Sequence, residues 1–144
     1  MTNQDALTCY TDGASRGNPG PAAYAFLILS EDTILAERSE YIGLTTNNVA
    51  EYRGVIAALT VAAQHTSRTV TLYSDSELVI KQINGQYRVR KEHLAGLHKK
   101  VLDLGRHFET VHFFTVPREN LYIRKVDNLC NLTLDNVSGN NQKR

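Results

Sequence analysis

The sequence predicts an α/β protein built on a mixed five-stranded sheet that is flanked by helices. The first 45 residues carry short apolar or alternating runs separated by turns, which is typical of β-strands. The apolar spacing then changes to the helical period, and strands and helices alternate to the end of the chain. That order predicts an antiparallel meander followed by parallel strands, within a single domain. A chain of 144 residues has room for a substantial core.

Three strands joined by short connections are expected first. Residues 7–11 (Leu-Thr-Cys-Tyr-Thr) are rich in β-prone side chains, and 22–30 are almost entirely apolar, as expected for a central strand. Residues 33–43 alternate loosely and form the third strand. The Gly/Pro-rich segment 13–20 and Glu31-Asp32 supply the connections, so the three strands form an antiparallel meander.

The pattern changes at Asn48, from which side chains at helical spacing continue to Ala63 in an alanine-rich segment. The second half of the chain predicts a strand at 69–74, helices at 76–84 and 92–107, a strand at 111–116 and a final helix from about 125 to 137. Residues 1–137 are expected to form the domain, and 138–144 a flexible polar tail.

Composition excludes several classes of protein. No apolar run is long enough to cross a bilayer, and the N-terminus lacks the basic and apolar regions of a secretory signal, so we expect a cytoplasmic protein without membrane contact. Cys9 and Cys130 lie far apart and outside any Cys-x-x-Cys pattern. Two buried thiols are expected, with a disulfide as the alternative.

Charge is unevenly distributed along the chain. The whole protein carries a net charge of +1, but the segment 81–107 has seven basic and two acidic residues, a net +5, which leaves −4 for the remainder. Such a segment suits a protein that binds a polyanion in one region. A solvated helix face explains the same count equally well.

Four carboxylates lie at the ends of expected elements. Asp12 and Asp75 end two strands that can be neighbours, Glu51 lies in the first turn of the long helix, and Asp127 lies near the start of the last helix. They can therefore converge at one edge of the sheet, where carboxylate oxygens suit a hard divalent cation. Each has a structural alternative: a capping box between Asn48 and Glu51, a helix cap at Asp75, and an exposed helix position at Asp127.

Four sequence blocks together resemble type 1 ribonuclease H. They occur in the order of that family and span roughly residues 7–135. The blocks are Tyr10–Gly20 (Tyr-Thr-Asp-Gly-Ala-x-x-Gly-Asn-Pro-Gly), Thr45–Tyr52 (Thr-Thr-Asn-Asn-Val-Ala-Glu-Tyr), Tyr73–Ser76 (Tyr-Ser-Asp-Ser) and Val126–Asn131 (Val-Asp-Asn-Leu-Cys-Asn). Because the chain has no Trp and residues 86–93 pass directly into a helix, it resembles the compact form without a basic protrusion.

The resemblance implies an endonuclease that hydrolyses the RNA strand of RNA–DNA hybrids by a two-metal-ion mechanism, leaving 5′-phosphate and 3′-hydroxyl ends. It implies two Mg²⁺ ions, with Mn²⁺ as a substitute, because oxygen ligands suit both. The implied metal ligands are Asp12, Glu51, Asp75 and Asp127, which are also the implied catalytic residues. The implied partner is the hybrid itself, bound by a monomer that needs no other protein.

The resemblance also implies a set of substrate contacts. Discrimination of RNA requires recognition of the 2′-hydroxyl. Residues near this path are expected to include Gly13, Ser15, Asn18, Asn47 and Asn48, and Thr46 is expected to hold a phosphate of the DNA strand.

Relatives place a histidine in the loop before the last carboxylate, but this chain has none there. Arg118 is the expected catalytic substitute, since it neutralises phosphate charge but cannot act as a base near neutral pH.

Two other functions fit parts of the sequence. Another nuclease of the same superfamily, such as a Holliday-junction resolvase or a transposase-like enzyme, shares the acidic site. The Thr-Asn-Asn-x-x-Glu block at Thr46–Glu51 argues against it, because by the resemblance this block recognises the ribose. A non-catalytic hybrid-binding module is the third candidate. Four acids argue against it, because binding alone favours fewer negative charges beside phosphate.

Overall fold

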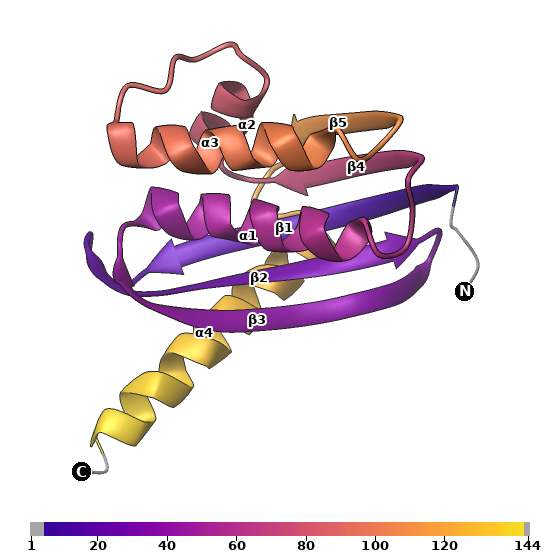
Figure 1. The fold of residues 1–144 in the computed structure, drawn as a ribbon. Coiled ribbons are helices and arrows are strands. Elements are labelled where there is room, and N and C mark those ends of the chain that lie inside the picture. Colours follow the sequence, from indigo (N-terminus) through magenta and orange to yellow (C-terminus); the bar gives the residue numbers. More distant parts are fainter. Residues whose placement is uncertain (1–4, 143–144) are drawn as a thin grey trace.

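The computed structural model describes residues 5–142 and contains one five-stranded sheet with four helices in that part of the chain (Figure 1). The elements are β1 (Ala6–Ser15), β2 (Gly20–Ser30), β3 (Thr33–Thr45), α1 (Asn47–Ala62), β4 (Thr69–Ser74), α2 (Glu77–Ile83), α3 (Glu92–Gly105), β5 (Thr110–Thr115) and α4 (Leu121–Gln142). The sheet order is β3-β2-β1-β4-β5.

The sheet is mixed, as predicted. The meander β1-β2-β3 is antiparallel, and β4 joins β1 in parallel, followed by β5 in parallel to β4. The connection from β3 to β4 passes through α1. The connection from β4 to β5 passes through α2 and α3, because these two strands are parallel neighbours and need a crossover. The sheet thus has β1 near its middle, between an antiparallel and a parallel neighbour.

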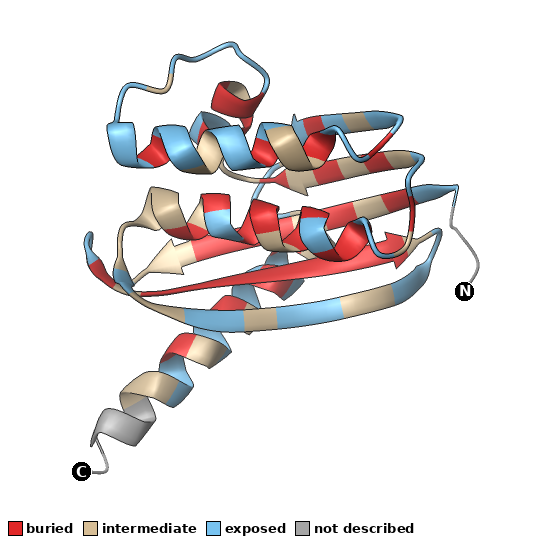
Figure 2. Cartoon of the chain, viewed as in Figure 1, coloured by how far each residue is buried: buried red, intermediate tan, exposed pale blue. Residues whose placement is uncertain are grey.

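Two apolar cores lie on opposite faces of the sheet. Helices α1, α2 and α3 contribute to one core, and α4 crosses the other face against β1, β2 and β3 (Figure 1). Side chains of β2 alternate between them: Phe26 and Ile28 belong to the first core, Leu27 and Leu29 to the second. Burial on both faces explains why β2 is almost entirely apolar (Figure 2).

The end of the chain differs from the prediction. Helix α4 begins at Leu121, about four residues earlier than expected, because Asn120 Oδ1 accepts hydrogen bonds from the backbone N–H groups of Tyr122 (2.9 Å) and Ile123 (3.2 Å). The same helix continues to Gln142, beyond the helix end predicted at residue 137, and the flexibility of the tail from residue 138 stays a prediction. Residues 143 and 144 lie outside the described residues.

Both cysteines are free and buried, one in each core. The disulfide alternative is therefore wrong. In the described part of the chain, none of the helices is both long and apolar enough to cross a bilayer.

Helix α1 and strand β1 approach each other closely because each has a glycine at the crossing. A Cβ atom at Gly13 of β1 would overlap the backbone of Ala50 and Glu51, and one at Gly54 of α1 would lie 3.1 Å from the backbone oxygen of Asp12. Side chains at these positions would push the helix off the strand. The close approach of the two backbones therefore depends on the missing side chain of Gly13.

Replacing Gly13 with Ala should lower the free energy of unfolding by about 3 kcal/mol, because the overlap involves backbone atoms that cannot turn away. Urea denaturation monitored by circular dichroism measures the change. Gly96→Ala in α3 is the matched control: no atom lies within 4 Å of its added Cβ, so it should be neutral or stabilise the protein by about 1 kcal/mol. Equal effects of the two substitutions would contradict the steric explanation.

Candidate active site

Three carboxylates meet where β1 and β4 separate. The parallel pairing of these strands ends at Tyr10 and Tyr73. Asp12 lies two residues further along β1, and Asp75 directly follows the end of β4. Glu51 of α1 completes the group. One carboxylate oxygen from each of the three residues lies within 4.8 Å of the others. The predicted convergence of acids is therefore present for these three residues.

Asp12 lies inside a strand, which differs from the prediction that it ends one. Strand β1 continues to Ser15, still paired with β2, and Asp12 is opposite Ala25. The residue is 7% exposed. Pairing with β2 fixes the backbone on both sides of Asp12. Its carboxylate is therefore held in place where β1 is no longer paired with β4.

Glu51 lies in the second turn of α1, and the predicted first-turn position is wrong. Thr46 caps the helix by accepting a hydrogen bond from the backbone N–H of Val49 at 3.3 Å. The capping box proposed for Asn48 and Glu51 is therefore replaced by a different cap. The close contact of α1 with Gly13 brings Glu51 next to Asp12.

Asp75 is not used as a helix cap. The cap of α2 is the neighbouring Ser76, whose hydroxyl accepts from the backbone N–H of Val79 at 3.4 Å and also interacts with the Glu51 carboxyl. Arg118 Nε lies 3.8 Å from Asp75 Oδ2, with 85% of the arginine side chain exposed. A solvent-exposed cation thus lies beside Asp75.

Asp127 of α4 borders the three-carboxylate group without being part of it. It is close enough to Asp12 to affect that residue by its charge and by a side-chain hydrogen bond. The structure thus brings all four predicted acids to one region, with Asp12 at the centre.

Burial and mutual repulsion make these acids hold their protons. Burial, followed by the charges of Asp75, Asp127 and Glu51, raises the pKa of Asp12 to about 8. Burial also raises the pKa of Glu51 to about 7, against a lowering effect of the Ser76 hydroxyl. The pKa of Asp75 is raised by burial, although Arg118 opposes this. A divalent cation removes this repulsion, so the donor set fits a metal ion.

The turn between β1 and β2 is tied to the start of α1 by reciprocal hydrogen bonds. Asn18 Oδ1 accepts from the backbone N–H of Asn47 at 3.0 Å, and Asn47 Oδ1 accepts from the backbone N–H of Ser15 at 3.4 Å. The Ser15 hydroxyl oxygen is buried without a hydrogen-bond partner in the described part of the chain. Four residues of the predicted substrate set therefore lie together here: Gly13, Ser15, Asn18 and Asn47.

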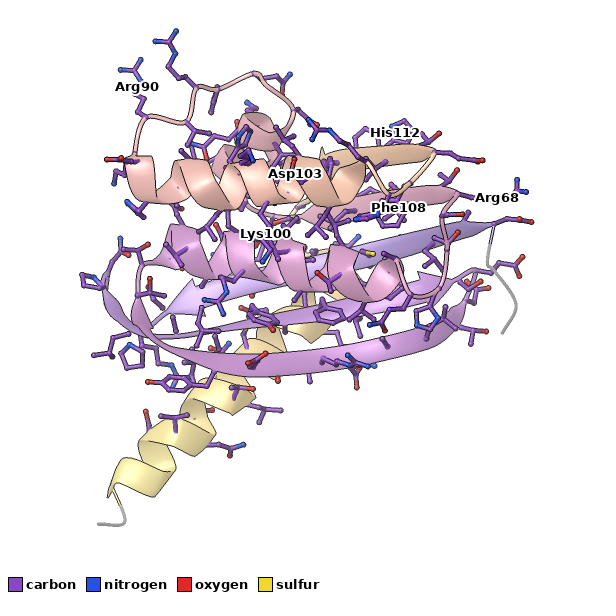
Figure 3. The ribbon with its side chains drawn as sticks, viewed as in Figure 1. Arg68, Arg90, Lys100, Asp103, Phe108 and His112 are labelled. Atoms are coloured by element: carbon purple, nitrogen blue, oxygen red, sulfur yellow. The ribbon has the colours of Figure 1, made fainter. Side chains whose placement is uncertain are left out.

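A groove of about 530 Å³ lies beside the start of α1. Asn48 lines it together with side chains of α2 and of the segment that joins α2 to α3, including Tyr87, Arg88, Arg90 and Lys91. Arg90 projects from this segment away from the sheet (Figure 3). Part of the basic segment identified in the sequence thus lies beside Asn48, which precedes Glu51 by three residues in α1.

Several residues around the site were not predicted to belong to it. The Cys130 thiol lies 3.6 Å from the backbone oxygen of Asp12, and burial raises its pKa well above the usual range. Ser76 contacts Glu51, although only its position beside Asp75 hinted at this. Asn131 and Asp135 follow Asp127 at intervals of four, which was a usable helical signal.

A five-stranded mixed sheet with acids where β1 and β4 separate defines the ribonuclease H-like class of α/β proteins. A family model described as "Reverse transcriptase-like" matches residues 10–132. Ribonuclease HI of Halobacterium salinarum is 40% identical over 129 residues, which cover 89% of this chain and 64% of that protein. The bifunctional protein Rv2228c of Mycobacterium tuberculosis is 40% identical over 127 residues, covering 86% of this chain and 34% of that one.

Solved structures agree with these matches. The N-terminal RNase H domain of Rv2228c, solved as a fusion with maltose-binding protein, superposes with a TM-score of 0.89 at 34% identity and covers 95% of this chain and 99% of its own. RNase H1 of H. salinarum gives 0.86 at 39% identity, covering 91% and 98%. LC11-RNase H1, in complex with an RNA/DNA hybrid, gives 0.83 at 34% identity, covering 91% and 98%. The chain belongs to the type 1 ribonuclease H family.

The raised pKa of Asp12 gives a testable dependence of stability on pH. In the unfolded chain this carboxyl is ionised above about pH 4, whereas the folded metal-free protein keeps it protonated up to about pH 8. The free energy of unfolding of the metal-free protein should therefore fall as pH rises from about 4 to about 8, because over this range only the unfolded state gains the favourable ionised form. Asp12→Asn removes the penalty and should raise the free energy of unfolding at pH 8 by about 2–4 kcal/mol.

Urea denaturation in EDTA at pH 4 and pH 8 measures this difference. The gain from Asp12→Asn should be small at pH 4, where the carboxyl is neutral in both states. A gain of the same size at both pH values would show that burial of the charge is not its origin.

Proposed function

We propose that this protein is an endonuclease that hydrolyses the RNA strand of RNA–DNA hybrids. The observation that carries the proposal is the group of three carboxylates within 4.8 Å, with pKa values raised by burial and repulsion. Relatives named ribonuclease H, and the hybrid bound in the LC11-RNase H1 structure, support the substrate class.

The donors suit two Mg²⁺ ions, with Mn²⁺ as a substitute, because all are hard oxygen ligands. Asp12, Glu51, Asp75 and Asp127 would hold the ions, with Asp12 at the centre of the four carboxylates. When bound, such ions activate a water molecule and neutralise charge on the phosphate, which gives 5′-phosphate and 3′-hydroxyl ends. The positive charge of the ions would offset the repulsion among the carboxylates and keep them deprotonated.

Recognition of the ribose is assigned to the β1–β2 turn and the start of α1. Asn18 and Asn47 use their side-chain oxygens within the protein, so their amide NH₂ groups remain to donate to a ligand. The buried Ser15 hydroxyl also has unused hydrogen-bonding capacity. We assign these groups, the backbone at Gly13 and the nearby Glu51 carboxylate to the 2′-hydroxyl path.

The DNA strand is assigned to the groove beside α1. Thr46 and Asn48 lie at the N-terminus of α1, where backbone N–H groups favour a phosphate. Arg88, Arg90 and Lys91 add positive charge on the far side of the groove. Since the extra basic helix of larger relatives is missing, a monomer with modest, salt-sensitive hybrid affinity is proposed.

The first experiment compares a labelled RNA–DNA hybrid with a DNA duplex of the same sequence in Mg²⁺, Mn²⁺ and EDTA. Cleavage should be confined to the RNA strand and should require metal. Asp75→Asn should abolish cleavage while the circular dichroism spectrum is retained, because one ligand is lost without a change of shape.

Other results would support the alternative functions. Cleavage of the DNA duplex would favour another nuclease of the superfamily. Binding of the intact hybrid without cleavage in either metal would favour the binding module.

Arg118→Ala should lower kcat about ten- to a hundredfold, because an exposed cation beside Asp75 is lost where negative charge develops. The Kd for the hybrid, measured in Ca²⁺ to prevent cleavage, should remain nearly constant. Arg118→Lys keeps the charge and should recover part of the rate. An unchanged kcat in Arg118→Ala would remove this residue from the proposed catalytic set.

A further inference from the structure

A stripe of polar side chains runs along α4 from the fourth carboxylate. Asp127, Asn131 and Asp135 are four residues apart, so they lie on one face of the helix. Asn131 Nδ2 donates to Oδ2 of Asp127 in a long hydrogen bond of 3.5 Å. This contact holds one oxygen of Asp127, which also forms a side-chain hydrogen bond with Asp12.

Arg16, in the turn between β1 and β2, reaches across to this stripe. Its Nη2 atom lies 2.6 Å from Asp135 Oδ1. The same atom donates to the backbone oxygen of Asn131 at 3.3 Å and to its Oδ1 at 3.5 Å. One guanidinium therefore contacts both residues that follow Asp127 on the stripe.

The contacts of Arg16 with Asn131 and Asp135 oppose electrostatic repulsion among the acids. Asp127 raises the energy of ionised Asp12, so repulsion among the acids tends to move α4 away from the sheet. Apolar packing of Ile123, Val126 and Cys130 holds the first half of the helix. Arg16 supplies a polar attachment beyond these residues, on the same side as Asp127.

The same turn also holds α1. Asn18 and Ser15, which flank Arg16, are bonded to Asn47 at the start of the helix that carries Glu51. The β1–β2 turn therefore connects three elements that provide carboxylates: β1, α1 and α4.

We propose that Arg16 is a positioning residue for Asp127. By holding Asn131 and Asp135 it fixes the carboxylate for binding of a divalent cation shared with Asp12. The inference rests on the proposed function, in which Asp127 is a metal ligand. Arg16 needs no contact with the substrate for this role.

A second ion pair between α4 and the sheet provides a matched control. Lys125 Nζ lies 3.2 Å from Glu37 Oε1 of β3, and the two side chains are 47% and 38% exposed, compared with 39% and 61% for Arg16 and Asp135. Lys125 precedes Asp127 by two residues, so it lies on the other side of the helix. Its loss weakens the attachment of α4 without disturbing the stripe.

The test is a calorimetric titration of the substrate-free protein with Mn²⁺. Arg16→Gln and Asp135→Asn should each raise the Kd for Mn²⁺ about three- to fivefold, as expected for loss of a partly exposed ion pair. The double variant should be no worse than either single one, because both remove the same contact. Arg16→Lys keeps the charge and should bind Mn²⁺ more tightly than Arg16→Gln.

Cleavage kinetics provide an independent measurement. In Arg16→Gln the Mg²⁺ concentration for half-maximal cleavage should rise, while kcat at saturating Mg²⁺ and KM for the hybrid stay within about twofold. Lys125→Gln should leave both the Kd for Mn²⁺ and the Mg²⁺ requirement unchanged, even if thermal stability falls equally.

The proposal is overturned if Arg16→Gln binds Mn²⁺ like the wild type, or if Lys125→Gln weakens binding as much. In either case cleavage by the wild type would leave the proposed function standing. A wild-type protein that neither binds Mn²⁺ nor cleaves the hybrid would remove both.

Discussion

Repulsion among carboxylates held in a poorly hydrated gap is the constraint on which this structure depends. Asp12 is almost completely buried, yet it faces Glu51, Asp75 and Asp127. The metal-free protein accommodates this by keeping protons on the acids near neutral pH, which lowers its stability relative to a chain with neutral side chains there. The rest of the fold supplies attachments that keep the acids together despite that cost.

Those attachments come from both faces of the sheet. Strand β2 is buried on each side and holds the backbone of β1, while α1 rests on Gly13 and α4 packs on the opposite face. Each layer brings its own acid: α1 provides Glu51 and α4 provides Asp127. The geometry of the site therefore depends on how the helices pack on the sheet, since no single segment provides all four acids.

Much of this could be predicted from the sequence. The period of the apolar residues gave the order of all nine elements, and the family motifs brought out the four acids. The predicted ends of helices and strands were wrong where a capping side chain or a neighbouring strand sets the boundary. Thr46 and Asn120 cap helices earlier than the apolar pattern suggests, and β1 continues past Asp12 because β2 pairs with it there. The contacts of Arg16 depend on a residue 119 positions away in the chain, which no local pattern encodes.

The two free thiols have a use that follows from their places in the layers. Cys9 is buried between the sheet and α1, and Cys130 between the sheet and α4. A thiol reagent reaches either one only when the layer above it opens. The native chain therefore contains two separate chemical reporters, one for the detachment of each face, and their relative labelling rates rank which helix layer leaves the sheet more readily.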